Sequence, residues 1–320
     1  MSSTSPSNYL RKWKVLVTAV EGSQSFSYDL SDLRCVFRVK DQCTSPMSEC
    51  TLEVYNLNNK TANRLLKSGF NVQLFAGYQN SRYGKIFDGD IVQSFRNYHD
   101  GVDEILQILA LSGNRMLTSN WVSKSMAGGQ TRNQIVKTVA ADRKITLKEA
   151  AEVQEKLDEA RYPRGQVIFG EASDVLSDAA ARVNAVCQVT KSGVLEMRSL
   201  AASAASTVQG SAGKTLDLNY KNGLVGSPTY SEQGITITSL LDSRIKPLSL
   251  VKINNQYLER SYGNVNQLGI VEQDRRLVDP DGEYRIMSVV HAGDTHGDVW
   301  QTECLGVGRN RTIKDMAIVL

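Results

Sequence analysis

The sequence has 320 residues, of which 41% are hydrophobic and 22% are charged, and its formal net charge is +3. This length allows two or three compact units, because single hydrophobic cores stop growing near ~250 residues. The nearly balanced charge argues against a polybasic nucleic-acid binder, and no stretch of ~18 apolar residues predicts a membrane span.

The N-terminal segment and the cysteines give little sign of a secreted protein. Residues 1–9 are polar, lack the basic and apolar regions of a signal peptide, and are expected to form a disordered tail. The five cysteines never have C-x-x-C spacing, which argues against a disulfide framework or a structural zinc site. They are Cys35, Cys43, Cys50, Cys187 and Cys304.

The segment 10–118 has the hydrophobic pattern of a β domain. Its apolar residues recur with a period of two, which indicates strands near 13–19, 33–39, 50–54, 70–76, 85–96 and 104–111. The last strand is apolar on both faces, so we expect it to be buried on both sides. One short helix at 61–68 interrupts the strands, and Gly69 is placed to end it. The pattern predicts an antiparallel barrel or sandwich.

The segment 119–200 has helical periodicity and is expected to be a small α/β unit. Thr131 and Gln134 have the spacing of a capping box, which starts the first helix. A second amphipathic helix has its ends at Lys148 and Arg161. A third helix, capped by Ser173, is followed by a hairpin with strands at 186–190 and 194–198.

A linker and a second β unit follow. Residues 201–213 are small and polar, apart from one valine, and are typical of a flexible linker. The second β unit is expected over 214–307, with strict alternation around Ile235 and Ile237 and a further strand at 250–253. The C-terminal tail, 308–320, ends in an apolar run, which favours docking on another surface.

The two β units share one pattern. Strands 70–76, 85–96 and 104–111 correspond in order to 248–254, 283–291 and 299–305, with an insertion between Asn255 and Gly282 in the second unit. We therefore predict a mainly β, α+β protein, in which two related antiparallel β-barrels flank a small helix-and-hairpin domain. The residues expected on buried strand faces are Leu33, Phe37, Leu74 and Leu109 in the first unit and Ile237, Val251 and Trp300 in the second.

One dense polar cluster raises the question of chemistry. Imidazole and carboxylate are metal ligands, but the Gly-Asp dipeptides within this cluster are typical of turns, and we favour a hairpin connection. Replacing His291 and His296 together by alanine should then leave assembly nearly unchanged. The cluster consists of His291, Asp294, His296 and Asp298.

Other catalytic patterns are weaker still. His99 falls in an expected polar turn, and the sequence has no G-x-S-x-G elbow and no phosphate-loop spacing. Paired carboxylates of a glycosidase are set by the fold and stay open at this point. The sequence therefore predicts no catalytic, cofactor-binding or metal-binding residue.

Several short motifs, taken in order, resemble those of baseplate hub proteins from contractile-tailed bacteriophages. The resemblance covers about residues 10–307. In the first β unit the motifs are V-Y-N-L-N at 54–58, N-V-Q-L-F-A-G-Y at 71–78 and I-F-D-G-D-I at 86–91. The middle unit has P-R-G-Q-V-I-F-G at 163–170 and the helix at 176–183. The second β unit has the turn G-L-V-G-S-P at 223–228, the strand G-I-T-I at 234–237 and the closing hairpin at 284–305.

This resemblance implies a structural protein of the virion, located in the tail baseplate and assembled in the host bacterial cytoplasm. It implies a homotrimeric ring that joins the six-fold tail tube protein to the three-fold central spike protein. Other baseplate proteins and the tape measure protein are further candidate partners. DNA would pass through the lumen without sequence readout, and no cofactor is implied. Tandem barrels suit this role, because three chains then present six similar units.

Two alternatives remain beside the hub. One is the corresponding hub of a non-contractile tail or an R-type injection particle. The other is a tail-associated cell-wall hydrolase, which clearing of cell walls by the purified protein would favour. A discrete trimer without activity would favour the hub.

Overall fold

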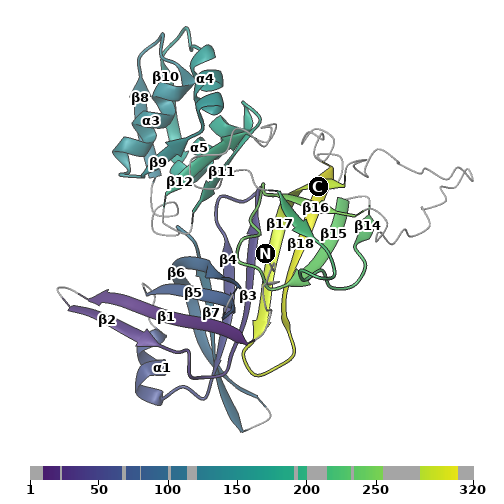
Figure 1. Ribbon diagram of the computed structural model, residues 1–320. Coiled ribbons are helices and arrows are strands. Elements are labelled where there is room, and N and C mark those ends of the chain that lie inside the picture. Colours follow the sequence, from purple (N-terminus) through teal and green to yellow (C-terminus); the bar gives the residue numbers. More distant parts are fainter. Residues whose placement is uncertain are drawn as a thin grey trace, which may run out of the picture.

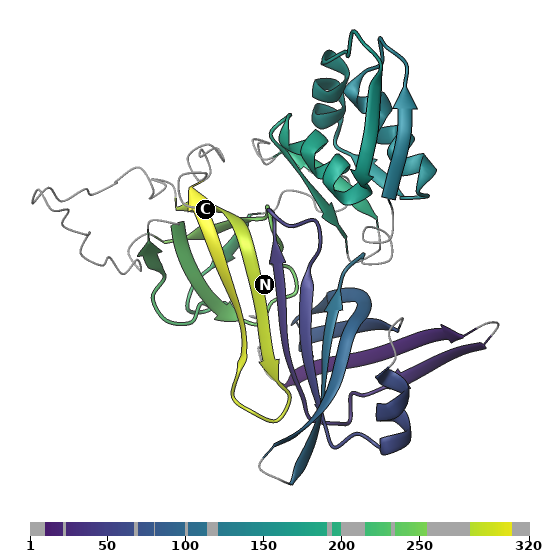
Figure 2. The same ribbon diagram turned by 180° about the vertical axis from the view of Figure 1, so that it is seen from behind.

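The computed structural model describes residues 10–21, 24–66, 70–79, 81–99, 102–113, 121–190, 194–199, 215–231, 234–254 and 282–308. The predicted fold class is confirmed, because the chain is mostly β-strand with a few helices. Two β units lie side by side, and three of the four helices in the described residues gather in a middle unit that stands apart from them (Figures 1 and 2). The expected N-terminal tail, the linker at 201–213 and the segments 255–281 and 309–320 lie outside the described residues.

The first β unit contains seven antiparallel strands in the order β3-β4-β7-β6-β5-β1-β2. The helix α1 (Asn59–Leu65) connects β4 to β5. The strands are β1 (Arg11–Glu21), β2 (Gln24–Asp29), β3 (Cys35–Gln42), β4 (Glu49–Tyr55), β5 (Asn71–Tyr78), β6 (Ser81–His99) and β7 (Asp103–Leu111).

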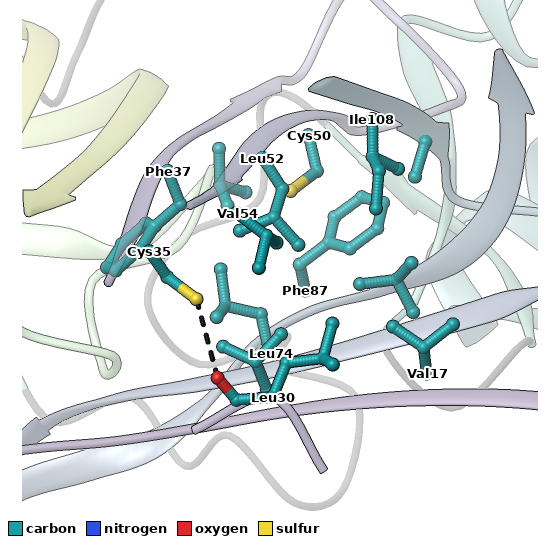
Figure 3. Close-up of a cluster of buried hydrophobic side chains, with 14 of the residues drawn as sticks. Val17, Leu30, Cys35, Phe37, Cys50, Leu52, Val54, Leu74, Phe87 and Ile108 are labelled. Atoms are coloured by element: carbon teal, nitrogen blue, oxygen red, sulfur yellow. Dashed lines mark hydrogen bonds between the residues drawn. The ribbon is translucent and has the colours of Figure 1, made fainter. Parts of the chain in front are cut away.

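This sheet curls around one hydrophobic core, which Figure 3 shows. Residues of β1, β3, β4, β5, β6 and β7 all contribute to the same buried cluster. The connection that follows β2 adds Leu30, whose amide donates to the Val15 carbonyl at 2.9 Å. The Leu30 carbonyl in turn accepts a weak hydrogen bond from the Cys35 thiol at 3.6 Å. The unit is therefore barrel-like, with β1 and β3 lining opposite sides of its core.

The burial predicted for the first unit is right for two of the four residues. Phe37 and Leu74 are buried, as expected. Leu33 is only half-buried because it lies in the connection before β3, and Leu109 is half-buried because it lies on the outer face of β7, where Ile108 and Ala110 point inward. The prediction that β7 is fully buried on both faces was therefore wrong.

Two further predictions for this unit need correction. Asn58 caps α1 by accepting from the Lys60 amide, so the helix begins and ends earlier than 61–68, and Gly69 lies outside the described residues. His99 does not lie in the expected polar turn, because it is the last residue of β6 and pairs with Asp103 of β7.

The middle unit has a core of its own between helices and short sheets. β8 (Trp121–Met126) pairs with β10 (Gln166–Glu171), and β12 (Leu195–Ser199) pairs with β11 (Ala185–Val189) and, in parallel, with β9 (Leu147–Glu149). The helices are α3 (Arg132–Asp142), α4 (Ala151–Glu159) and α5 (Ala172–Ala181). None of the helices in the described ranges is long and apolar enough to cross a membrane.

The predicted capping box of α3 is confirmed, and the other two helices start at different residues from those expected. The Thr131 hydroxyl accepts from the Gln134 amide at 3.2 Å, and the Gln134 side chain accepts from the Thr131 amide at 2.9 Å. Lys148 belongs to β9, so α4 begins only at Ala151. Glu171, not Ser173, is the cap residue of α5.

The second β unit has the strand order β13-β16-β17-β18-β15-β14. Ile237, Val251 and Trp300 are buried, as predicted, although Trp300 packs in the core of the first unit and not in that of the second. One pairing departs from the antiparallel expectation, because β13 runs parallel to β16. The strands are β13 (Leu216–Leu218), β14 (Thr229–Ser231), β15 (Gly234–Leu240), β16 (Leu250–Ile253), β17 (Glu283–Asp294) and β18 (Trp300–Gly308).

The two β units are joined into one 13-stranded sheet, because β17 of the second unit pairs with β3 of the first. Figures 1 and 2 both show β17 lying alongside β3. The order β13-β16-β17-β18-β15-β14 repeats the order β1-β5-β6-β7-β4-β3, except that β13 runs parallel to β16 whereas β1 runs antiparallel to β5. The matched strand order expected from the sequence is therefore present in the fold.

Candidate functional site

The polar cluster at 291–298 does not converge on one point. His291 lies in β17, not in a turn, where it is 2% exposed and its Nδ1 lies 2.8 Å from the Thr302 hydroxyl. His296 and Asp298 lie in the connection between β17 and β18, and Thr295 Oγ1 contacts His296 Nδ1 at 3.0 Å. In the ranges that the structure describes, no three His, Cys, Asp or Glu side chains are grouped to hold a metal ion.

Asp294 fixes this connection to the first β unit. Its carboxylate accepts from Arg34 at 2.8 Å and from the His296 amide at 2.9 Å. The hydrogen bond from Arg34 is the main reason that the pKa of Asp294 lies below its ordinary value. The Thr295 amide and hydroxyl also bond to the Cys35 backbone, at 3.0 Å and 2.9 Å. These residues therefore form a structural latch between the two β units.

The β3–β17 ladder continues this latch along the sheet. Its register runs from Asp294 opposite Val36 to Ser288 opposite Gln42. Beyond the ladder, the Cys43 amide donates to the Met287 carbonyl at 2.9 Å. Backbone hydrogen bonds of a ladder fix register and orientation together, so the two units are held as one body.

Trp300 carries the second unit into the core of the first. It begins β18, is 3% exposed, and belongs to the hydrophobic cluster of the first unit. Its ring lies edge-on to Phe37 and Trp13, at centroid distances of 5.4 Å and 6.1 Å. Its indole N–H donates to the Gly77 carbonyl at 3.2 Å, so both the apolar body and the polar group are satisfied.

A buried ion pair forms a second bridge between the units. Arg82 of β6 and Asp242, which follows β15, are 2% and 1% exposed, and Arg82 Nε lies 3.5 Å from Asp242 Oδ2. Burial lowers the pKa of the Arg82 guanidinium, and the Asp242 carboxylate opposes that shift. Arg244 also binds the carboxylate, at 2.7 Å, from a half-exposed position.

The backbone around Arg82 is shaped to accept this pair. The guanidinium donates to the Asn222 carbonyl, and Ser243 Oγ donates to the Arg82 carbonyl at 2.7 Å. Gly223 adopts a φ of +105°, and a Cβ at this position would collide with the guanidinium. Only glycine fits there without displacing the arginine. This explains the turn glycine in the motif at 223–228.

Large apolar side chains are exposed on β6 and on the β8–β10 sheet. On β6, Val92, Phe95 and Tyr98 are 39%, 42% and 73% exposed, and Phe95 and Tyr98 lie on opposite faces of the strand because they are three residues apart in a regular part of the ladder. On the β8–β10 sheet, Trp121 and Phe169 are 51% and 70% exposed and contact each other edge-on at a centroid distance of 5.1 Å. Exposed apolar patches of this kind mark protein contact surfaces more often than chemical sites.

Sequence reasoning found the polar cluster but missed Arg82 and Asp242. A buried charged residue interrupts a strand pattern in the same way as a solvated one, so the period of two gives no signal for it. The nearby turn motif at Gly223 was the one available clue. The five cysteines are all buried free thiols, and burial raises the pKa of Cys35 to about 12, which leaves that thiol unreactive at neutral pH.

Comparisons with known proteins relate this chain to tail proteins by sequence family and by fold. A family model described as Baseplate hub gp41 matches residues 14–257. The fold is similar to a 43 kDa tail protein of prophage MuSo2 from Shewanella oneidensis, with a TM-score of 0.56, 11% identity, and coverage of 93% of this chain and 97% of that one.

Two further solved structures are similar at the level of the fold. A tail protein from Neisseria meningitidis MC58 has a TM-score of 0.55 at 13% identity and covers 93% of this chain and 97% of its own. A chain of a Francisella PdpA–VgrG complex has a TM-score of 0.58 at 10% identity, with coverage of 94% and 59%. No curated protein matches the sequence.

Proposed function

The chain belongs to the baseplate hub gp41 family, and we propose on this premise that three copies form a closed ring at the end of a phage tail tube. The family makes the protein a structural component of the tail. The proposed ring joins a six-fold tube to a three-fold spike and encloses the DNA channel.

The repeated strand order is the observation that carries this proposal. Each chain holds two β units with the same sequence of strand neighbours, β1-β5-β6-β7-β4-β3 and β13-β16-β17-β18-β15-β14. Three chains then supply six similar units, which match a six-fold partner while the ring stays three-fold. Head-to-tail contacts of this kind form a ring when the rotation closes.

The rigid coupling of the two units supports the same proposal. The β3–β17 ladder, the buried Trp300 and the Arg82–Asp242 pair fix one unit against the other. A ring that matches six-fold symmetry needs a constant angle between the two β units of each chain. The proposed partners are the tail tube protein on one face and the spike protein on the other. Other baseplate proteins and the tape measure protein are further candidate partners.

The DNA channel needs no base-reading surface. The formal charge of +3 over 320 residues gives little of the electrostatic attraction on which DNA binders depend. We therefore assign the lumen a passive role, through which DNA moves without sequence readout.

The test is the mass of the purified protein in solution, alone and with its tube and spike partners. Three chains of 35.3 kDa give a particle of about 106 kDa, and light scattering should report this mass. A monomer in the presence of both partners would contradict the ring. Clearing of cell walls by the same sample would instead favour the hydrolase alternative.

A further inference from the structure

The β8–β10 sheet of the middle unit has one covered face and one open face. Val122 and Ile168 point inward and are buried in the core of the middle unit. Trp121, Val167 and Phe169 point to the other side and are exposed. Figures 1 and 2 both show this sheet on the side of the middle unit that faces away from the second β unit. In the described part of the chain, β8 and β10 pair only with each other.

On this open face, each rung of the ladder combines an apolar side chain with a hydroxyl or a carboxyl group. The opposed pairs are Trp121 with Glu171, Ser123 with Phe169, and Ser125 with Val167. These six residues include no lysine or arginine, and Lys124 of β8 is bound to Asp142 at 2.6 Å. The face therefore lacks the cations with which proteins bind nucleic acids and anionic headgroups.

The two aromatic rings form a corner on this face. Their centroids lie 5.1 Å apart, and their planes are at 82° to each other, so the edge of one ring contacts the face of the other. The π face of an aromatic ring is negative and attracts positively polarised hydrogens. The axial C–H groups of a pyranose ring are hydrogens of this kind, while its hydroxyl groups lie at the rim, where serine and glutamate side chains can bind them.

The size of the face decides between a sugar chain and a protein. Two strands, each ~4.8 Å wide, over the five paired positions 121–125 give a face of roughly 160 Å². A stable protein–protein interface buries ~800 Å² on each partner. The face by itself is thus too small to hold a protein, but it is wide enough for a single extended chain of sugar rings.

We propose that the open face of the β8–β10 sheet binds the glycan chain of peptidoglycan. The rings of Trp121 and Phe169 stack on successive sugars, Ser123 and Glu171 bind hydroxyl groups, and Val167 contacts an N-acetyl methyl group. A β-1,4-linked chain suits a flat sheet because its substituents are equatorial, which makes it an extended ribbon with C–H groups on both faces. This binding function is separate from the ring proposed above and does not depend on it.

Tryptophan resonances of the full chain test the site directly. The chain has three tryptophans, and Trp13 and Trp300 lie against the core of the first β unit. After labelling with 5-fluorotryptophan, chitotetraose, the tetramer of β-1,4-linked N-acetylglucosamine, should shift the fluorine resonance of Trp121 and leave the other two in place. Maltotetraose, which is α-linked and has no N-acetyl groups, should shift none of them. Trp121→Phe assigns the resonance.

Sedimentation with purified peptidoglycan sacculi tests the source of the glycan. Trp121→Ala and Phe169→Ala should each lower the affinity for sacculi at least tenfold. Both side chains are exposed, so thermal unfolding should stay as in the wild type. Tyr98→Ala removes an exposed aromatic side chain from β6 and is the matched control, with an expected affinity equal to that of the wild type. Trp121→Phe keeps an aromatic face and should bind within about threefold of the wild type.

Three results would overturn the proposal. The first is a Trp121 resonance that chitotetraose does not move, and the second is a wild-type protein that does not sediment with sacculi. The third is sedimentation that persists in Trp121→Ala with Phe169→Ala, which would place the glycan elsewhere. Each of these results leaves a 106 kDa trimer in solution untouched, so the ring and the glycan site fail separately.

Discussion

The buried Arg82–Asp242 pair is a rare feature at the scale of single residues, because both charges are almost fully removed from water. Arg82 Nε approaches the carboxylate without forming a hydrogen bond to it. Desolvation of two ions offsets most of their attraction, so such a pair contributes more to the relative position of the units than to stability.

Removing one partner of this pair should be costly. Asp242→Ala leaves Arg82 buried without its counterion and should lower the free energy of unfolding by about 3–5 kcal/mol. Arg244→Ala removes the half-exposed partner of the same carboxylate and should cost only about 0–1 kcal/mol. Urea unfolding followed by fluorescence measures both, and equal losses in the two variants would contradict this account.

Asp294, which binds Arg34 of the first β unit, should make the stability of the protein depend on pH. Its pKa is lowered from 3.8, first by Arg34, so its contribution to stability is fully present above pH 4 and is lost as the pH falls through the lowered value. The difference in thermal unfolding temperature between the wild type and Arg34→Gln should therefore be constant near neutrality and vanish in acid. A difference that grows as the pH falls would rule out this ion pair as its source.

His291 also changes the expectation for the histidines. A turn would tolerate His291→Ala together with His296→Ala, but His291 is 2% exposed and contacts Thr302. Removing this buried side chain leaves a cavity and takes away one of the two partners of the Thr302 hydroxyl, which keeps the hydrogen bond from the Asp242 amide. The double variant should therefore be destabilised through position 291 alone.

At the scale of elements, β18 contributes to both units, because its first residue packs in the neighbouring core. Trp300→Ala should lower the free energy of unfolding by about 3–5 kcal/mol, since a large buried side chain is removed. The adjacent Val299 is 49% exposed, and Val299→Ala should stay within about 0.5 kcal/mol of the wild type.

The position of Trp300 also predicts which strands should lose protection from amide hydrogen exchange in Trp300→Ala. Its contacts are with Phe37 and Trp13 of the first unit. Amide hydrogen exchange in Trp300→Ala should therefore accelerate in β1 and β3 as well as in β18. Acceleration confined to the second unit would contradict the shared core.

The sequence predicts elements well where one face is buried and one is solvated. The strand at 250–253 coincides with β16, and the alternation of Ile235 and Ile237 marks β15. β8 was not predicted, because its outer face carries Trp121 with two serines and its inner face mixes Val122 with Lys124, which hides the period of two. The start of α4 also differs from the prediction, because Lys148 belongs to β9 and pairs with Glu196 of β12, 48 residues later in the chain. Such a distant pairing cannot be inferred from local periodicity.

At the scale of the whole molecule, the presence of two similar β units could be predicted from the order of their strands. Their joining into one sheet could not. The pairing of β17 with β3 depends on a backbone edge, and edges leave no trace in composition or periodicity. The parallel pairing of β13 with β16 could not be predicted either, because the sequence of a three-residue strand does not indicate whether its partner runs parallel or antiparallel to it. Both became visible only once the fold placed the strands together.

The β3–β17 ladder has a consequence for the order of events during synthesis. Arg34 and Asp294 lie 260 residues apart, so β3 leaves the ribosome long before its partner strand exists. At ~5–20 residues per second, the β3 edge waits roughly 13–52 s with unpaired backbone groups. Arg38 and Lys40 point outward from this strand, and charged side chains discourage a waiting edge from pairing with the wrong chain. The nascent protein thus meets its greatest aggregation hazard before its last strands emerge.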